Sequence, residues 1–516
     1  MAVARTRSVA LVGVAGRTVE VEADVGNGLA GIHLIGLPDT ALSEARDRVR
    51  SAMVNSHYPW PDARIIVSLF PASLPKRGSQ FDLAIAVAIL GAAGVVPAER
   101  IAEPFFLGEL GLDGRIRGVR GVLPSVLGAA RHGDVTVVVP AANAAEAVLV
   151  PDVKVIPVGD LRQLVEWLRK GDEPPSPAVE EQQEPESAEP PQTTGAPDVD
   201  LADVVGQPVA RRALEVCAAG GHNLWMLGPP GTGKTMLAER LPTLLPDLVL
   251  DHALEVTAIH SVAGTLPPNA PMMCRPPFVS PHHTATAAAI IGGGSTTVRP
   301  GAVSLAHRGV LFLDEAPEFQ RSVLDALRQP LESGRVTVSR SVGSVTFPAR
   351  FMLILAANPC PCAQAEDQND TCRCSPTVKR RYIGRLSGPL LDRIDMKVTV
   401  VRSSRRELLA DRQFVEDSKT VAERVLAARE RAAARLAGTQ WRSNAEIPSA
   451  VLHADFRPSA EAMRPMTACL DSGTLTARGL DRVVRVAWTL ADLAAKDAPG
   501  QDETNTALGF WLGTHS

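Results

Sequence analysis

The chain has 516 residues, of which 45% are hydrophobic and 21% charged, and its formal net charge is −4. This length exceeds what one hydrophobic core holds and predicts about two to four domains of an ordinary globular protein. The longest apolar run, Leu83 to Pro97, is shorter than the roughly 20 residues of a membrane span, and no signal peptide opens the chain. We therefore expect a cytoplasmic protein with no membrane partner.

Residues 1–170 are expected to form a domain of mixed strands and helices. The apolar patterns that predict strands lie at 9–25, 63–70 and 135–140, and those that predict helices lie at 43–56 and 81–94. Together they indicate an α/β or α+β domain.

The acidity of the chain is concentrated in residues 171–200. This segment holds nine acidic residues and seven prolines but no lysine or arginine, so it cannot bury enough apolar surface to fold and predicts an extended linker. Without those nine acids, the rest of the chain carries 53 basic against 48 acidic residues. The net negative charge therefore does not exclude a nucleic-acid partner.

Residues 201–405 alternate predicted helices with continuous apolar strands. The predicted strands lie at 223–228, 310–315 and 351–358. Such units predict a parallel sheet covered on both faces. Apolar spacing is helical from about Leu408 onward, so residues 406–516 predict a helical C-terminal domain.

A glycine-rich turn joins the first of these strands to a helix and fits the pattern GxxxxGK(S/T). In such a turn the backbone N–H groups cradle phosphates, Lys234 reaches the terminal phosphates and the Thr235 hydroxyl binds Mg²⁺. The turn consists of Gly228, Pro229, Pro230, Gly231, Thr232, Gly233, Lys234 and Thr235. We therefore expect ATP and Mg²⁺ to bind here.

Polar side chains follow the next two predicted strands. Asp314 is expected to hold Mg²⁺ through water and Glu315 to polarise the attacking water. Two solvated carboxylates are the alternative. Asn358, at the end of the third strand, is placed to position the same water beside the γ-phosphate.

These three strand ends resemble the site of an AAA+ ATPase. The resemblance implies a ring in which an arginine of the neighbouring subunit completes each site. Arg393, in GPLLDRID, is the candidate, and Arg478, in LTARGLDRVVRVA, is placed like the second sensor on a lid helix. A surface or helix-face ion pair is the alternative for either arginine.

Longer blocks resemble the magnesium-chelatase-like ComM/YifB family throughout. They lie at 36–53, 71–90, 108–124, 281–334, 339–362 and 385–395. The resemblance implies a homo-hexameric, DNA-stimulated AAA+ helicase that promotes branch migration in homologous recombination, notably in natural transformation, with single-stranded or branched DNA as its partner.

Residues 335–351 alternate as two short strands around SVGS and predict a hairpin before the strand that leads to Asn358. Its placement resembles the pore hairpin of replicative-helicase AAA+ relatives, with Arg340 near the tip. A ring of such arginines would make a positive constriction for a DNA backbone. An ordinary solvated arginine is the alternative.

The segments PKRGSQFDL and GELGLDGRIRGVRGV resemble the Lon-type protease fold, in which a serine and a lysine form a catalytic dyad. On this chain Gln80 stands at the nucleophile position and Leu123 at the lysine position. Without nucleophile and base there is no acyl chemistry, so the resemblance implies an inactive domain that serves as a scaffold or DNA-facing platform. Ser79, one place away, is expected to be structural.

Four of the seven cysteines form two CxC pairs, Cys360 with Cys362 and Cys372 with Cys374. A reducing compartment makes a disulfide unlikely to persist, whereas four thiolates suffice for a closed tetrahedral zinc site. Four free cysteines are the alternative.

The adjacent His282 and His283 resemble a metal pair. Neighbouring side chains are expected to diverge, however, so we expect these histidines to orient a loop or to pack.

Two other functions stay open. One is the motor subunit of a metal chelatase, which would work with a partner that carries a metal-dependent adhesion site, because this chain has no DxSxS motif. The other is a remodelling chaperone that threads protein. Stimulation of ATP hydrolysis by single-stranded DNA, as against porphyrin or unfolded protein, distinguishes the three.

Overall fold

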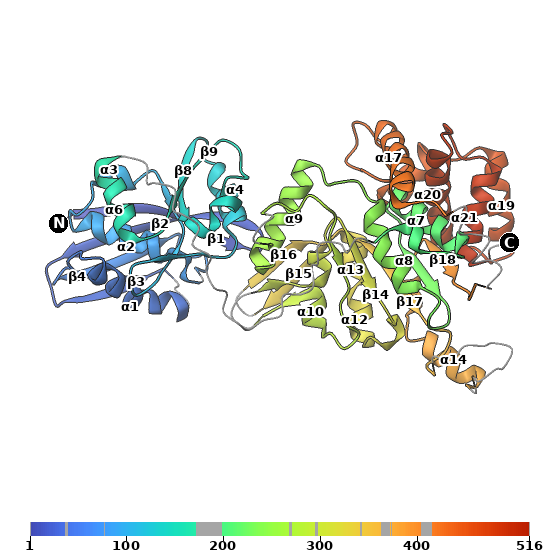
Figure 1. Cartoon of the computed structure of the whole chain (residues 1–516), viewed down its shortest axis with the longest axis horizontal. Coiled ribbons are helices and arrows are strands. Elements are labelled where there is room, and N and C mark those ends of the chain that lie inside the picture. Colours follow the sequence, from blue (N-terminus) through green and yellow to red (C-terminus); the bar gives the residue numbers. More distant parts are fainter. Residues whose placement is uncertain are drawn as a thin grey trace. The chain divides into compact units, whose positions relative to one another are not determined.

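The computed structural model describes residues 2–36, 40–76, 78–171, 199–267, 271–294, 298–340, 343–362, 372, 374–403 and 415–514. Most of the predicted linker lies outside these residues. The chain divides into two compact units, drawn in Figure 1. Unit 1 comprises Met1–Pro191, Leu254–Met273 and Ser295–Arg299, and unit 2 comprises Gln192–Ala253, Cys274–Gly294 and Pro300–Ser516.

Unit 1 is built on a seven-stranded mixed sheet with the order β3-β4-β2-β1-β5-β8-β9. The strands are β1 Ala2–Val12, β2 Ala15–Gly26, β3 Gly31–Ile35, β4 Arg64–Phe70, β5 Phe105–Phe106, β8 Val135–Pro140 and β9 Val153–Val158. β2 pairs antiparallel with β1 and β4, and the other neighbours are parallel. A short hairpin, β6 Glu109–Leu110 with β7 Ile116–Arg117, lies apart from this sheet.

Helix α2 (Asp82–Ala92) is the central helix of unit 1. All eleven of its residues are buried, so the long apolar run of the sequence forms a core helix packed on β1 and β2. The other helices of unit 1 are α1 Thr40–Asn55, α3 Ala98–Ile101, α4 Val122–Ala130, α5 Ala144–Ala147 and α6 Leu161–Lys170. Helix α9 (Leu250–Ala263) begins in unit 2 and continues, from Leu254, in unit 1.

Unit 2 contains the predicted parallel sheet, with the order β11-β14-β17-β10-β18. The strands are β10 Leu224–Leu227, β11 Phe278–Val279, β14 Val310–Leu313, β17 Met352–Ala357 and β18 Met396–Thr399. Every neighbouring pair is parallel. The central strands β14 and β17 are buried at every residue, which explains why each is a continuous apolar run in the sequence.

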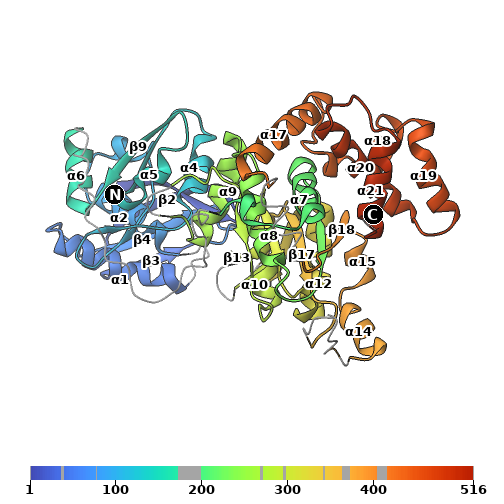
Figure 2. The same ribbon diagram turned by 45° about the vertical axis from the view of Figure 1, so that its right-hand side comes forward.

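Several helices and one hairpin lie before and between these strands in the chain. They are α7 Pro208–Gly220, α8 Lys234–Arg240, α10 Ala287–Ile291, α11 Ala302–Leu305, α12 Arg321–Ala326, α13 Arg328–Ser333, α14 Pro376–Ile383 and α15 Gly388–Leu391, with the hairpin of β15 Arg335–Arg340 and β16 Gly343–Pro348. Figure 2 shows α14 projecting from the body of unit 2, below α15.

The C-terminal residues form the predicted helices. They are α17 Ser418–Arg435, α18 Ser449–Ala454, α19 Ala460–Asp471, α20 Ala477–Leu493 and α21 Gln501–Leu512. Their buried side chains belong to the same apolar cluster as the sheet of unit 2, and Trp511 of α21 lies under the ammonium of Lys397 of β18, 4.4 Å from the ring centroid. Among the described residues, no helix is long and apolar enough to span a bilayer.

A buried ionic cluster joins β18 to helix α20. The carboxylate of Asp395 accepts hydrogen bonds from the Arg482 guanidinium at 2.9 Å and from the Asn223 backbone N–H at 2.8 Å, and His222 Nδ1 lies 3.8 Å away. Burial opposes the charge, but Arg482, His222 and the Asn223 N–H outweigh it and hold the pKa of the Asp395 carboxyl well below its usual range.

We expect Asp395→Ala to lower the free energy of unfolding by about 3–5 kcal/mol, because it leaves the Arg482 charge without its buried partner. Since the folded-state pKa of Asp395 is depressed, its contribution is present above the unfolded pKa of about 4 and is lost as the pH falls below it. Urea denaturation of wild type and Asp395→Asn should therefore converge in acid, whereas Asp471→Ala, at an exposed position, should match wild type throughout. A constant difference down to acid pH would contradict this account.

Candidate nucleotide site

The glycine-rich turn follows β10 and leads directly into α8, which begins at Lys234. Gly231 and Gly233 have φ of 76° and 87°, the left-handed region that glycine adopts without strain. At Gly228 a Cβ atom would lie 2.1 Å from the Val400 carbonyl oxygen, so only glycine lets the turn pass β18. The turn therefore depends on glycine at three positions.

Lys234 and Asn358 meet at this turn. The Lys234 ammonium donates to the carbonyl oxygens of Gly228 and Pro229 at 2.7 and 2.8 Å, and to Asn358 Oδ1 at 3.2 Å. They meet because β10 lies beside β17, with Leu227 opposite Ala357, so both strands end at one edge of the sheet. Burial lowers the pKa of Lys234, and the carboxylates of Asp314 and Glu315 oppose that shift.

Thr235 and Asp314, the two predicted Mg²⁺ ligands, are in direct contact. The Thr235 hydroxyl donates to Asp314 Oδ2 at 2.6 Å, from the first turn of α8 to the residue that follows β14. One hydroxyl and one carboxylate are hard oxygen ligands of the kind that Mg²⁺ takes together with waters and phosphates. The donor set therefore fits the ion.

Glu315 occupies a strained turn directly after Asp314. Its backbone is left-handed, with φ of 49°, which costs a non-glycine residue on the order of 1–3 kcal/mol. Its own N–H donates to Asp314 Oδ1 at 2.8 Å, and about half of its side chain is exposed. The carboxylate is thus accessible to a reactant beside Asp314, the predicted Mg²⁺ ligand.

His283 is a neighbour of this site that the sequence reasoning missed. Its Nδ1 lies 3.4 Å from Glu315 Oε2. The prediction that the two histidines diverge is wrong, because the ring centroids of His282 and His283 lie 4.1 Å apart. His282 also contacts the Thr284 hydroxyl at 2.8 Å, which agrees with a loop-orienting role. Nothing in the sequence around His283 could have indicated its contact with Glu315, because no motif relates the two positions.

Arg393, predicted to complete the neighbouring subunit's site, and Arg478, predicted as the second sensor, differ in environment. Arg393 is buried within its own chain, where its guanidinium pairs with Glu332 and donates to the Pro389 carbonyl oxygen. Arg478 is the second residue of α20 and is exposed. The structure therefore brings neither arginine to Lys234 through a described contact.

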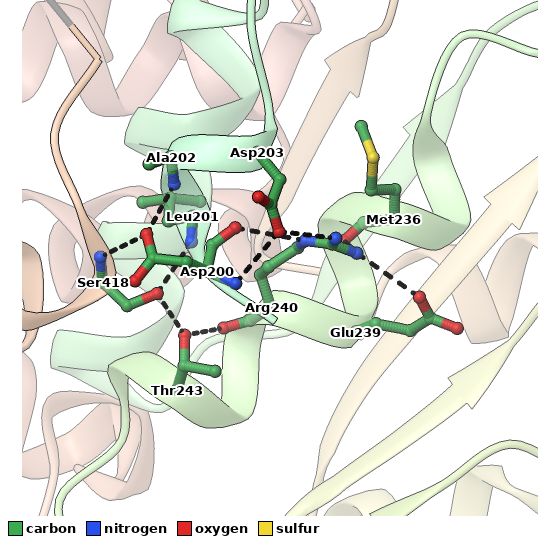
Figure 3. Close-up of polar contacts among 9 residues, drawn as sticks. All are labelled: Asp200, Leu201, Ala202, Asp203, Met236, Glu239, Arg240, Thr243 and Ser418. Carbon is green, nitrogen blue, oxygen red and sulfur yellow. Dashed lines mark hydrogen bonds and ion pairs between the residues drawn. The ribbon is translucent and has the colours of Figure 1, made fainter. Parts of the chain in front are cut away.

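A polar network, shown in Figure 3, fixes the far end of α8. The Arg240 guanidinium donates to Asp203 Oδ2 at 3.0 Å and to the Asp200 carbonyl oxygen at 3.3 Å. The Ser418 N–H donates to Asp200 Oδ1 at 3.0 Å, and the Ser418 hydroxyl lies 2.7 Å from that of Thr243. The helix that carries Lys234 is thus joined both to the Asp200–Asp203 segment and to the first residue of α17.

Two further predictions concern the segment on either side of β17. β15 and β16 form the predicted antiparallel hairpin, which ends with Arg340 opposite Gly343. The side chain of Arg340 and residues 341–342 lie outside what the structure describes.

The sulfur atoms of the four predicted zinc ligands, Cys360, Cys362, Cys372 and Cys374, all lie within 4.8 Å of one another. The four cysteines thus converge, with nine residues separating the two CxC pairs in the sequence.

The predicted vestigial protease positions are occupied by structural contacts. Gln80 Nε2 donates to the Val9 carbonyl oxygen at 2.9 Å, and the Ser79 hydroxyl donates to Glu109 rather than to a lysine. Leu123 is buried, and its N–H donates to Glu146 at 2.8 Å.

Comparisons with known proteins cover almost the whole chain. Three family models match: "Subunit ChlI of Mg-chelatase" at residues 21–143, "Magnesium chelatase, subunit ChlI" at 200–408 and "Magnesium chelatase, subunit ChlI C-terminal" at 415–511. An uncharacterized protein of Mycobacterium tuberculosis is 52% identical over 99% of both chains.

Two named relatives are similar over comparable lengths. The competence protein ComM of Haemophilus influenzae is 40% identical over 99% of this chain and 97% of its own, and the YifB protein of Escherichia coli is 39% identical over 97% and 95%. With this identity and coverage, the chain belongs to the magnesium-chelatase-like ComM/YifB family.

Proposed function

We propose that this chain is a cytoplasmic, hexameric, ATP-dependent DNA motor, a helicase or branch-migration translocase that acts in homologous recombination or natural transformation. The observation that carries the proposal is the meeting of three strand ends, where Lys234 contacts Asn358 and Thr235 contacts Asp314. The relative named competence protein supports the assignment to DNA uptake and recombination. The ligands proposed are ATP and Mg²⁺, with a zinc ion at the four cysteines.

In the proposed reaction the backbone of residues 228–233 holds the phosphates and Lys234 exchanges its carbonyl acceptors for phosphate oxygens. Thr235 and Asp314 would hold Mg²⁺, which supplies positive charge against the phosphates. Glu315 orients and polarises the attacking water, and Asn358 holds that water in line with the γ-phosphate. His283, 3.4 Å from Glu315, is placed to fix the direction of this carboxylate.

Two arginines are proposed to complete the site. Arg478, exposed at the start of α20, would contact the phosphates from the lid, and Arg393 would reach the nucleotide of a neighbouring subunit. This requires a ring, because Arg393 pairs with Glu332 within its own chain. Arg393 lies in the segment between Asn358 and β18. This position suits such a role, because the segment continues into β18 of the sheet that holds the site.

The hairpin of β15 and β16 is the proposed DNA contact. It lies between α13 and β17, so it is connected directly to the strand that ends at Asn358. Because the DNA backbone is recognised mainly through charge, an arginine near the tip suits contact with phosphates that slide past.

We expect Arg340→Ala to keep basal ATP hydrolysis within about twofold and to abolish its stimulation by single-stranded DNA, because one phosphate contact per subunit is lost around the ring. Arg335→Ala, exposed at the base of the same hairpin, should retain stimulation and serves as the control. Phosphate release measured with and without DNA checks this. Unchanged stimulation in Arg340→Ala would contradict the role given to Arg340.

A motor of a metal-chelatase or protein-remodelling complex is the second candidate. It is favoured by the three family models, which carry the names of a magnesium-chelatase subunit. The test is phosphate release in the presence of single-stranded DNA, porphyrin or unfolded casein in parallel. Stimulation by DNA alone supports the DNA motor, and stimulation by porphyrin or casein alone rejects it.

For the N-terminal domain we propose an inactive protease-like scaffold or DNA-facing platform. The contacts of Gln80 and Ser79 support this, because neither side chain pairs with a lysine. The same casein sample, followed for peptide release with ATP, tests it, and ATP-dependent cleavage would overturn it.

A further inference from the structure

The cysteine cluster offers sulfur ligands from two CxC pairs with nine residues between them in the sequence. Cys360 Sγ lies 2.9 Å from Cys362 Sγ and 3.5 Å from Cys372 Sγ, and the latter two sulfurs are also 3.5 Å apart. With Cys374, all four sulfur atoms fall within 4.8 Å of one another. Among the described residues, this is the one group of metal-ligating side chains so arranged.

The separations are longer than a disulfide bond and bring all four sulfur atoms within reach of one small cation. A disulfide bond is about 2.05 Å long, shorter than any of these contacts. Four thiolates on a zinc ion, with bonds of about 2.3 Å, are separated by about 3.8 Å at the edges of a tetrahedron. An iron–sulfur cluster spreads its four cysteines over several iron atoms and needs a wider cage.

We propose that Cys360, Cys362, Cys372 and Cys374 bind one structural Zn²⁺ ion. Four sulfur ligands fill the coordination sphere of zinc and leave no position for water or substrate, so the site is not a reaction centre. Its ligands select a soft or borderline cation over Mg²⁺, which takes oxygen ligands. The two metal sites of the chain are therefore chemically separate.

The place of the site in unit 2 indicates what the ion holds. Cys360 lies two residues after Asn358, and Cys374 directly precedes Ser375, whose hydroxyl caps α14 by accepting from the Val378 N–H. The ion thus closes the chain excursion between the end of β17 and the start of α14, the helix that projects from the body of unit 2 in Figures 1 and 2.

The segment after α14 is tied back to the body of unit 2. Arg385 pairs with Glu318 at 2.9 Å, and the Ser387 hydroxyl donates to Asp325 at 3.0 Å. This segment ends at Arg393. The connection between Asn358 and Arg393, the arginine proposed to act on the neighbouring subunit, is therefore fixed at both ends. The zinc ion holds the end near Asn358, and these two contacts hold the end near Arg393.

The first measurement is the metal content of full-length protein purified without an affinity tag under reducing conditions. We expect about one zinc per chain in wild type and in Cys274→Ser and Cys469→Ser, which replace cysteines outside the cluster. Cys372→Ser should lose most of the zinc. Wild-type protein without zinc, or with iron and inorganic sulfide, would overturn the assignment.

A second measurement does not depend on the variant being folded. Wild-type protein is titrated with an organomercurial reagent while a dye reports released zinc. Release should follow modification of a set of four thiols, and Co²⁺ exchanged into the site should give the visible bands of a tetrahedral thiolate complex. Zinc that leaves without thiol modification would contradict the site.

The consequence for the ring rests on the proposed ATPase. We expect Cys372→Ser to bind nucleotide like wild type but to assemble poorly by light scattering and to lose its ATP hydrolysis. Zinc present in a wild type that hydrolyses no ATP would refute the proposed function and leave the metal site intact. ATP hydrolysis by a wild type that contains no zinc would refute the metal site and leave the proposed function intact.

Discussion

Replacing Glu315 by glutamine is expected to lower ATP turnover by about 10²–10⁴-fold while ATP binding is retained. Glutamine has the size of glutamate but no negative charge with which to polarise the attacking water. The backbone contact from the Glu315 N–H to Asp314 is unaffected, so Asp314 and Thr235 should still hold Mg²⁺. Phosphate release and binding of a fluorescent nucleotide, measured on the same preparation, separate the two effects.

The matched control is Glu461→Gln, which removes an exposed carboxylate in the first turn of α19. It should hydrolyse ATP at a rate close to wild type. If Glu315→Gln retains turnover within a few-fold of wild type, the base is another group and the role assigned to Glu315 is wrong.

The same pair of proteins tests the motor itself. Wild type is expected to move a synthetic Holliday junction in an ATP-dependent manner, and Glu315→Gln is expected to bind the junction without moving it. A wild type that hydrolyses ATP but moves neither a junction nor a fork would favour a protein-remodelling function.

The parallel core of unit 2 could be predicted because its signals are local. β14 and β17 are buried on both faces, so each is a continuous apolar run, and each ends in polar residues at the same edge of the sheet. The site residues could be placed because parallel strands end at one edge of the sheet and because the glycine-rich motif follows the first predicted strand. The contacts of Lys234 with Asn358 and of Thr235 with Asp314 follow from this arrangement.

What could not be predicted depends on contacts between segments that have no periodic signal. The contact of His283 with Glu315 joins a loop to a strand end, and the Arg240 network joins three segments through single side chains. Residues 254–267 fall within the predicted 201–405 domain, yet they belong to unit 1, where the Ser261 hydroxyl donates to the buried Glu146. Only tertiary structure determines such pairings.

Arg393 is buried, but the partner in its ion pair is largely exposed. Within one chain Arg393 pairs with Glu332, whose side chain is 62% exposed. The ion pair can therefore be reached by another molecule from the side of Glu332. A guanidinium that acts on a neighbouring nucleotide must exchange this partner for phosphate oxygens. Such an exchange would make hydrolysis depend on the contact between subunits.

We therefore expect Arg393→Ala to lower ATP turnover by about 10³–10⁵-fold, the effect of removing an arginine that acts in trans. Nucleotide affinity and zinc content should stay close to wild type. Arg381→Ala, which removes an exposed arginine of α14, should cost far less and serves as the control.

A mixing experiment separates action in trans from a structural role. Glu315→Gln subunits lack the base but retain Arg393, whereas Arg393→Ala subunits retain the base. Each variant alone should be nearly inactive, but a mixture should regain hydrolysis, because the arginine of a Glu315→Gln subunit can serve the intact site of its Arg393→Ala neighbour. If the mixture stays inactive while mixed rings form, Arg393 acts within its own chain, and its pairing with Glu332 is its function.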